Sequence, residues 1–161
     1  KRLMATPMRH SDFLLSFLVS RGLFLLPEMG LLLGVGHFVL GVPIEGSLLL
    51  LALVIIVGAA AFAGIGMLLA SRTEKTESVS GLLNLVMLPQ YVLSGVFFSS
   101  SRFPAEAQPV IQALPLTQLN DCMRAVMLEG QGLADIGWRL AILLAYAVGT
   151  FALALKWFRW R

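Results

Sequence analysis

Residues 47–70 read SLLLLALVIIVGAAAFAGIGMLLA and contain no charged side chain. A helix needs about 20 apolar residues to cross the hydrocarbon core of a bilayer, so this stretch is long enough to span it. Of the 161 residues in the chain, 58% are hydrophobic and 13% are charged, whereas in soluble domains about a quarter of the residues are charged. The sequence therefore predicts an all-α membrane protein.

Three further apolar tracts are long enough to be membrane helices. The tract 81–98 is uncharged, and Pro89 is expected to kink it. In the last tract, Trp138 and Trp157 are separated by roughly 28 Å of helix, which is close to the thickness of the hydrocarbon core and places an aromatic residue at each interface. We predict a polytopic helix bundle with four transmembrane helices, at 13–42, 47–70, 81–98 and 138–158.

Residues 99–137 differ in composition from the tracts on either side. Their charges and prolines make the segment too polar to span, while short apolar runs indicate helices that lie at the interface or dip into the membrane. Thr117 suits an N-cap and Gly130 suits a stop for one of these helices. Asp121 and Arg124 are three residues apart on one helix face. We predict an extracytoplasmic re-entrant gate that includes Pro104, Pro115, Thr117, Asp121 and Arg124.

The positions of Lys and Arg predict the orientation of the chain. With four crossings, both ends and the loop 71–78 share one side of the membrane, and this side carries most of the basic residues. The basic side is cytoplasmic in most membrane proteins, so both ends are expected in the cytoplasm. The cytoplasmic set is Lys1, Arg2, Arg9, Arg72, Lys75, Lys156, Arg159 and Arg161, against Arg102, Arg124 and Arg139 on the opposite side.

Several kinds of site are not expected in this chain. The dipeptide Gly-Lys does not occur, so the chain has no phosphate-binding loop of the Gly-Lys-Ser/Thr type. One Cys and two separated His residues give no metal site, and no basic patch with interleaved aromatic residues indicates nucleic acid. We expect no catalytic residue, bound cofactor or metal.

Two groups of residues inside the tracts have alternative interpretations. Arg21 and Glu28 are seven residues apart and lie on nearly the same helix face, where they line a transport path. Alternatively, Arg21 reaches the cytoplasmic boundary and Glu28 makes a structural hydrogen bond. Gly30, Gly34 and Gly64 allow helices to approach closely, either within one subunit or between two.

An ordered set of short motifs resembles a known family. The set begins with LSGVFF at 93–98, followed by Phe103-Pro104, Gln108-Pro109 and LPLT at 114–117, with Asp121 and Arg124 after them. It resembles the C-terminal signature of ABC-2 type permeases. The opening KRLMATPMR resembles the cytoplasmic segment between the second and third membrane helices of that family. One departure is Ser99-Ser100-Ser101, where family members often have a proline after the two aromatics.

The resemblance covers the whole chain and implies a function. The four tracts correspond to the third to sixth membrane helices of the family, so the chain, which starts at Lys1, is expected to be a fragment. The family implies the permease subunit of an ATP-driven exporter of drugs, lipids or glycans in the cell (inner) membrane. Its expected partners are an ABC ATPase subunit that binds ATP and Mg, a second permease copy and membrane lipid.

The resemblance also assigns roles to particular residues. It places the contact with the ATPase in the segment 1–10, and it places the LSGVFF motif at the re-entrant gate. The implied coupling residues are Lys1, Arg2, Met4, Thr6, Pro7 and Arg9, and the implied gate residues from the motif are Gly95, Phe97 and Phe98.

Other functions are compatible with the composition alone. A fragment of a secondary transporter or channel would be expected to carry more charges at mid-membrane and an internal repeat. A membrane-embedded enzyme would have to use Asp121, Arg124 and His37, whose predicted depths differ. A non-catalytic assembly protein is a third alternative. The sequence names no substrate.

Overall fold

The structure, a computed structural model, describes residues 10–71 and 76–157. Within these ranges the chain is helical and has no strand, which confirms the all-α class. The elements are α1 His10–Phe38, α2 Leu48–Ala70, α3 Thr76–Leu93, the 3-10 helix η2 Ser100–Arg102, α4 Gln108–Ala113, α5 Pro115–Glu129 and α6 Leu133–Trp157.

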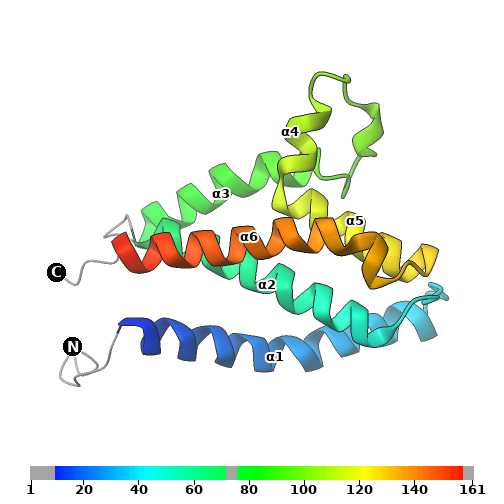
Figure 1. Cartoon of the computed structure of the whole chain (residues 1–161), viewed down its shortest axis with the longest axis horizontal. Coiled ribbons are helices and arrows are strands. Elements are labelled where there is room, and N and C mark those ends of the chain that lie inside the picture. Colours follow the sequence, from blue (N-terminus) through cyan, green and yellow to red (C-terminus); the bar gives the residue numbers. More distant parts are fainter. Residues whose placement is uncertain (1–9, 72–75, 158–161) are drawn as a thin grey trace.

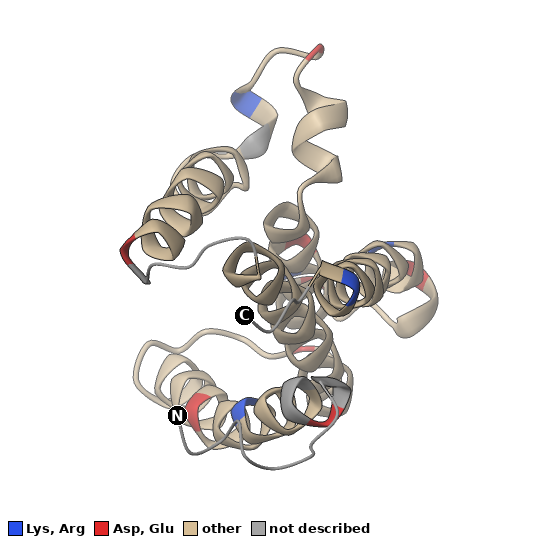
Figure 2. Ribbon diagram, turned by 90° about the vertical axis from the view of Figure 1, so that its left-hand side faces the viewer, with Lys and Arg blue, Asp and Glu red and all other residues tan. Residues whose placement is uncertain are grey.

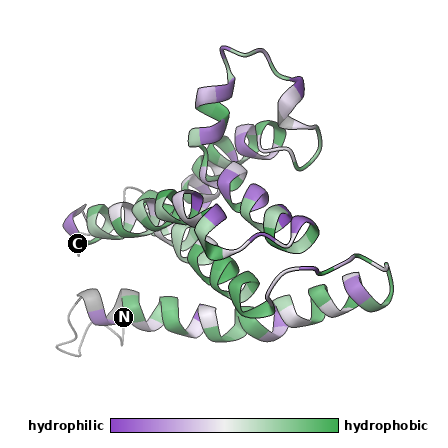
Figure 3. Cartoon of the chain, turned by 45° about the vertical axis from the view of Figure 1, so that its right-hand side comes forward, coloured by the Kyte–Doolittle hydropathy of each residue, from purple (hydrophilic) through white to green (hydrophobic). Residues whose placement is uncertain are grey.

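The core of the molecule lies where α2 packs against α5 and α6. The apolar face of α2 contributes Leu51, Val54 and Ala61, which are fully buried, and Val126 of α5 and Leu143 of α6 close over them. Figure 1 shows α2 and α6 crossing at the centre, with α1 on one flank and α3 and α4 on the other. Figure 3 shows α2 coloured mainly as hydrophobic, and its sequence, Leu48–Ala70, has no charged residue on any face, as expected for a helix between protein and lipid.

Three helices have the length and composition of a membrane span. These are Leu15–Phe38 within α1, Leu48–Ala70 and Leu133–Trp157. Helix α3 carries Glu77, Asn84 and Gln90 along its 18 residues and is less apolar than the other three. Figure 2, viewed end-on, shows how sparsely charged residues occur along the helices.

The connections between helices lie at two opposite ends of the molecule. The start of α1, the end of α2, the start of α3 and the end of α6 lie at one end (Figure 1). The connection from α1 to α2 and the turn from α5 to α6 lie at the other end.

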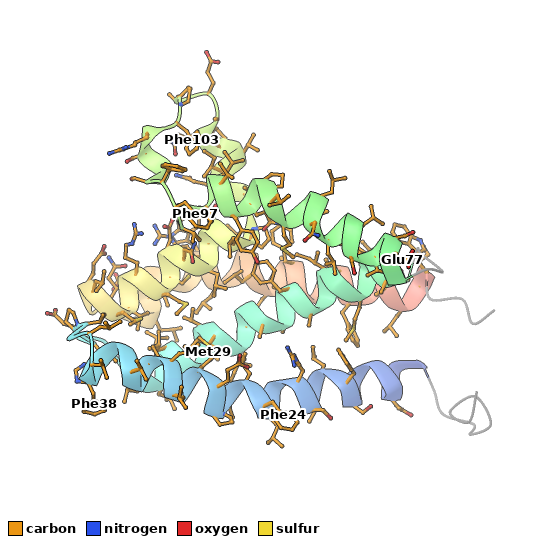
Figure 4. The ribbon with its side chains drawn as sticks, turned by 180° about the vertical axis from the view of Figure 1, so that it is seen from behind. Phe24, Met29, Phe38, Glu77, Phe97 and Phe103 are labelled. Atoms are coloured by element: carbon orange, nitrogen blue, oxygen red, sulfur yellow. The ribbon has the colours of Figure 1, made fainter. Side chains whose placement is uncertain are left out.

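Helix α1 packs only lightly on the rest of the described chain. Leu25 and Met29 touch the core, and Figure 4 shows Met29 directed toward α2 and Phe24 directed away from it. Phe24 is 70% exposed. Most of this apolar helix therefore needs a lipid or protein environment beyond the described chain.

Two helix boundaries differ from the apolar tracts. The tract 81–98 becomes helix only as far as Leu93, because Gly95 takes the left-handed region with φ 85° and turns the chain away. The last helix begins at Leu133, five residues before Trp138. Asp135 explains the earlier start, because its Oδ2 accepts a hydrogen bond from the N–H of Gly132 at 3.2 Å, as in a capping box.

Candidate functional site

The helical hairpin of α4 and α5 is the main element of the segment 99–137. Leu114 is extended and separates the two helices, and each of them has a proline in its first turn, where the missing N–H does no harm. Helix α5 ends at Gly130, which has φ 60°, and the N–H of Gln131 bonds to the carbonyl of Ala125 at 3.0 Å. Gly130 is therefore the stop that the sequence predicted.

Thr117 is not the N-cap of α5, and this part of the prediction is wrong. The helix begins two residues earlier, at Pro115, and Leu114 holds the cap position. The proline sets φ for a first helical residue and so starts the helix before Thr117 is reached. Thr117 instead points into the interior and is 1% exposed.

The hairpin reaches deep along α6. The hydroxyl of Tyr146 donates a hydrogen bond to the carbonyl of Ala113 at 2.7 Å, and Ala113 lies at the turn between α4 and α5. Tyr146 follows the start of α6 at Leu133 by about 20 Å of helix, at about 1.5 Å per residue. The turn of the hairpin therefore lies beside the middle of a helix long enough to span the membrane, as a re-entrant segment would.

The inner face of α5 is packed against α2. A Cβ added to Gly58 would come within 2.9 Å of Leu119 Cδ2, and one added to Gly46 would come within 2.8 Å of Val126 Cγ1. The N–H of Glu45 donates to the carbonyl of Met127 at 3.0 Å. These contacts hold α5 against α2 at Gly58 and against the segment that precedes α2 at Glu45 and Gly46.

Buried polar groups gather where α3 meets α5. Among the described residues, four polar side chains are buried: Gln90 and Ser94 at the end of α3, and Thr117 and Gln118 in α5. The side-chain amide of Asn120 donates to the carbonyl and the hydroxyl of Ser94, at 3.3 and 3.4 Å. Sequence analysis did not select Gln90, Gln118 or Asn120, although polar residues within apolar tracts were a signal that could have found them.

The predicted pair Asp121 and Arg124 is not an ion pair within the described part of the chain. Asp121 is half-buried and Arg124 is exposed. A different cation, Arg139 of α6, lies close enough to affect Cys122. Burial raises the pKa of the Cys122 thiol to about 11, while Arg139 acts to lower it and Asp121 to raise it. The thiol is therefore almost entirely protonated at neutral pH.

The residues that follow α3 form a lobe that stands away from the bundle (Figures 2 and 3). Gly95 makes the turn into it, and Phe97 and Phe98 are 70% and 57% exposed. The serines at the departure from the family pattern form a local turn, with Ser99 Oγ and Ser101 Oγ 2.7 Å apart. Pro104 lies beyond η2, where its carbonyl accepts a hydrogen bond from Ala107 at 2.9 Å. Figure 4 labels Phe97 at the base of the lobe and Phe103 within it.

The two charged residues of α1 lie in different surroundings. Arg21 lines a groove of about 240 Å³ between α1 and α2, whose other lining residues are apolar. Glu28 is exposed and, within the described ranges, forms no ion pair with Arg21. Arg21 and Glu28, which were predicted to act on the same helix face, therefore have different neighbours in the described chain.

The three glycines predicted to allow close helix packing lie in two different kinds of surroundings. A Cβ on Gly64 of α2 would collide with Thr150 Oγ1 and would lie 3.4 Å from the carbonyl oxygen of Ala147, both on α6. In the described chain, a Cβ on Gly30 or Gly34 would meet nothing within 4 Å outside its own helix. Gly64 thus faces another helix of this chain, whereas the α1 glycines face outward.

The coupling residues of the segment 1–10, namely Lys1, Arg2, Met4, Thr6, Pro7 and Arg9, lie outside the described residues. Within residues 10–71 and 76–157, no group of three or more His, Cys, Asp or Glu side chains could hold a metal ion.

Comparison with known proteins gives consistent matches. The family model described as ABC-2 type transporter matches residues 1–128. The inner membrane transport permease YhhJ of Escherichia coli (strain K12) is 28% identical over 160 residues, which are 99% of this chain and 43% of that protein. Nodulation protein J of Rhizobium meliloti (strain 1021) is 33% identical over 115 residues, 71% of this chain and 44% of that protein.

A further relative is the probable multidrug ABC transporter permease YbhS of Escherichia coli (strain K12), with 27% identity over 158 residues, 98% of this chain and 41% of that protein. The chain thus spans less than half the length of these curated relatives. No solved structure matches.

Proposed function

The chain belongs to the ABC-2 type transporter family, and from this membership we propose that it forms part of the permease of an ATP-driven exporter. Membership makes it the membrane component of an ABC transporter and a multi-pass membrane protein. The observation that carries the proposal is the family match over residues 1–128, which includes the re-entrant hairpin. The proposed reaction is transport, and the chemistry of ATP hydrolysis belongs to a partner.

Energy would reach this chain from a separate ABC ATPase subunit, which binds ATP and Mg. The absence of a Gly-Lys dipeptide supports this division of labour. The segment 1–10 precedes α1 directly and is the proposed contact with the ATPase. Movement of α1 and α2 would then open and close the path on alternate sides, because α2 and the segment before it pack closely on α5.

The proposed topology has four crossings, with α3 as the fourth. Its 18 residues correspond to about 27 Å of helix, nearly the thickness of the hydrocarbon core. The polar side chains of α3 are tolerable in lipid where they face other helices, as Gln90 does. The excess of Lys and Arg on one predicted side supports a topology with both ends in the cytoplasm and the hairpin on the opposite side.

Thiol labelling in intact cells tests this orientation. A Cys at Gln131, in the turn between α5 and α6, should react with a membrane-impermeant maleimide added outside. A Cys at Thr73 should react only after permeabilisation. The parent chain is the control, because its Cys122 is buried with a raised pKa and should stay unlabelled. Labelling of Thr73→Cys but not Gln131→Cys from outside would reverse the topology.

The proposed cargo is a drug, lipid or glycan, and the proposed assembly contains a second permease copy. The relatives include a probable multidrug permease and a nodulation protein, so the cargo class stays open among these three. The exposed face of α1, with Gly30 and Gly34, supports a contact with the second copy or with lipid. Arg21 would line the path or hold a lipid headgroup at the groove between α1 and α2.

Reconstitution of the full-length permease tests the proposed function. The permease purified together with an ATPase subunit should hydrolyse ATP, and hydrolysis should be lost when the ATPase carries a defective phosphate-binding loop. The permease alone should have no ATPase activity. Transport driven by an ion gradient without any ATPase subunit would instead support the secondary-transporter alternative.

A further inference from the structure

Three buried oxygen atoms on the contacting helices α3 and α5 have no hydrogen-bond donor from the described protein. They are Gln90 Oε1, Thr117 Oγ1 and Gln118 Oε1. Their side chains are 5%, 1% and 0% exposed, so bulk solvent does not reach them freely. Buried polar groups in folded proteins are nearly always hydrogen-bonded, which makes three such atoms on two contacting helices informative.

The hydrogen bonds of the two amides fix what kind of partner is needed. The Nε2 group of Gln90 donates to the carbonyl of Val86 at 3.4 Å, and the Nε2 group of Gln118 donates to the carbonyl of Gln112. Each amide nitrogen uses one of its two N–H groups in this way, while each Oε1 accepts no hydrogen bond from the described protein. The hydroxyl of Thr117 can also accept a hydrogen bond. The junction consequently requires donors.

Helix register places Gln90 and Thr117 at the same level. Asn120 of α5 is bonded to Ser94, which directly follows α3. Gln90 lies four residues before Ser94, and Thr117 lies three residues before Asn120, so each is one helical turn back on the same face. The bonds from Asn120 to Ser94 therefore bring the last turns of α3, which carry Gln90, against the first turns of α5, which carry Thr117. Figure 1 shows the end of α3 close to the start of α5.

The neutral character of the oxygens limits the ligand. Anions would be repelled by three acceptor atoms, and a metal ion is disfavoured because no carboxylate is among the buried polar residues. The ligand that fits neutral amide and hydroxyl oxygens in a dry environment is a neutral hydroxyl group. Its O–H would supply the missing hydrogen bond without bringing a charge into the membrane region.

We propose that Gln90, Thr117 and Gln118 form a buried acceptor site that binds hydroxyl groups. The hydroxyl comes from ordered water or from a molecule in transit, and the second source rests on the proposed transport function. Because the site joins α3 to the re-entrant hairpin, occupancy strengthens the contact between them. Either source would donate the same O–H hydrogen bond to the site. They differ in whether the hydroxyl belongs to bound water or to the transported molecule.

Thermal unfolding of full-length Thr117→Val in lipid nanodiscs tests the site. Valine has the same shape as threonine, and Thr117 donates no hydrogen bond among the described residues. If the hydroxyl group is bound, its loss should lower the Tm by roughly 2–4 °C. An unchanged or higher Tm would overturn the proposal. A buried hydroxyl without a hydrogen bond destabilises the folded state, so its removal would not lower the Tm. Gln112→Met, at an exposed position on α4, is the control and should leave the Tm unchanged.

A second arm distinguishes the two sources in the reconstituted complex with its ATPase. Octyl glucoside carries several hydroxyl groups, and octyl dimethylamine N-oxide has the same chain length and no hydroxyl. If a travelling hydroxyl binds, the octyl glucoside concentration for half-maximal ATPase stimulation should rise about 2- to 10-fold in Thr117→Val, with no change for the N-oxide. If water is the ligand, parent and variant should respond equally to both amphiphiles while the Tm difference persists. The Tm is measured without ATP or transport. The Tm result therefore tests the acceptor site even if the proposed transport function is wrong.

Discussion

Gly64→Leu is expected to lower the free energy of unfolding by about 1–3 kcal/mol or more, by separating α2 from α6. A side chain at Gly64 would collide with the hydroxyl of Thr150 and approach the carbonyl oxygen of Ala147. These two helices form the largest part of the core, and lipid itself gives little apolar driving force for helix association. The contact therefore depends on close backbone approach. Unfolding of the full-length protein in mixed micelles, followed by tryptophan fluorescence, measures the effect.

Gly66 provides a matched control in the same helix. A Cβ at Gly66 meets no atom within 4 Å in the described chain, so Gly66→Leu should change the stability by less than about 0.5 kcal/mol. Removing the hydroxyl and methyl of Thr150 in a Gly64→Ala, Thr150→Ala double variant should restore part of the stability lost in Gly64→Ala. If Gly64→Leu and Gly66→Leu lowered the free energy of unfolding equally, Gly64 would not be needed for the packing of α2 on α6.

The double substitution Arg2→Glu with Met4→Asp is expected to reduce transport and ATPase stimulation by about 10-fold or more. Under the proposed function the permease is driven through contact with an ATPase subunit, and the family resemblance places that contact in residues 1–10. Reversing one charge and placing another at an apolar position would disrupt such an interface. The measurement is ATP-dependent transport and ATP hydrolysis by the reassembled full-length complex.

Arg161→Glu is the control for the charge reversal, since Arg161 is predicted on the same side of the membrane but outside the coupling segment. It should leave both activities near those of the parent. The basic residues of the segment 1–10 also favour anionic lipid headgroups. If the double variant assembles and both activities match the parent complex, the segment is a topological anchor and the coupling contact lies elsewhere.

The elements that the sequence predicted well depend on local composition. The charge-free run at 47–70 became α2, Leu48–Ala70, because a long apolar run in lipid has no alternative to helix. Gly130 ended α5 for an equally local reason, since only its left-handed conformation was required. Neither result needed knowledge of a distant residue.

The features that the sequence missed depend on residues far apart in the chain. The contact between Ser94 and Asn120 links residues 26 positions apart, and Tyr146 reaches Ala113 over 33 positions. Gly34 and Gly64 are the same residue type in similar apolar surroundings, yet only Gly64 faces another helix. Periodicity identifies a face, whereas only the fold identifies what lies opposite it.

The pairing of α2 with α6 also sets an order for biosynthesis. The two helices are neighbours in the core, but the end of α6 at Trp157 follows the end of α2 at Ala70 by 87 residues. At roughly 5–20 residues per second, the ribosome needs about 4–17 s to make that stretch. Until then Gly64 of α2 lacks the helix that it faces in the described chain. The contact between α2 and α6 can therefore be made only when α6 leaves the translocation machinery.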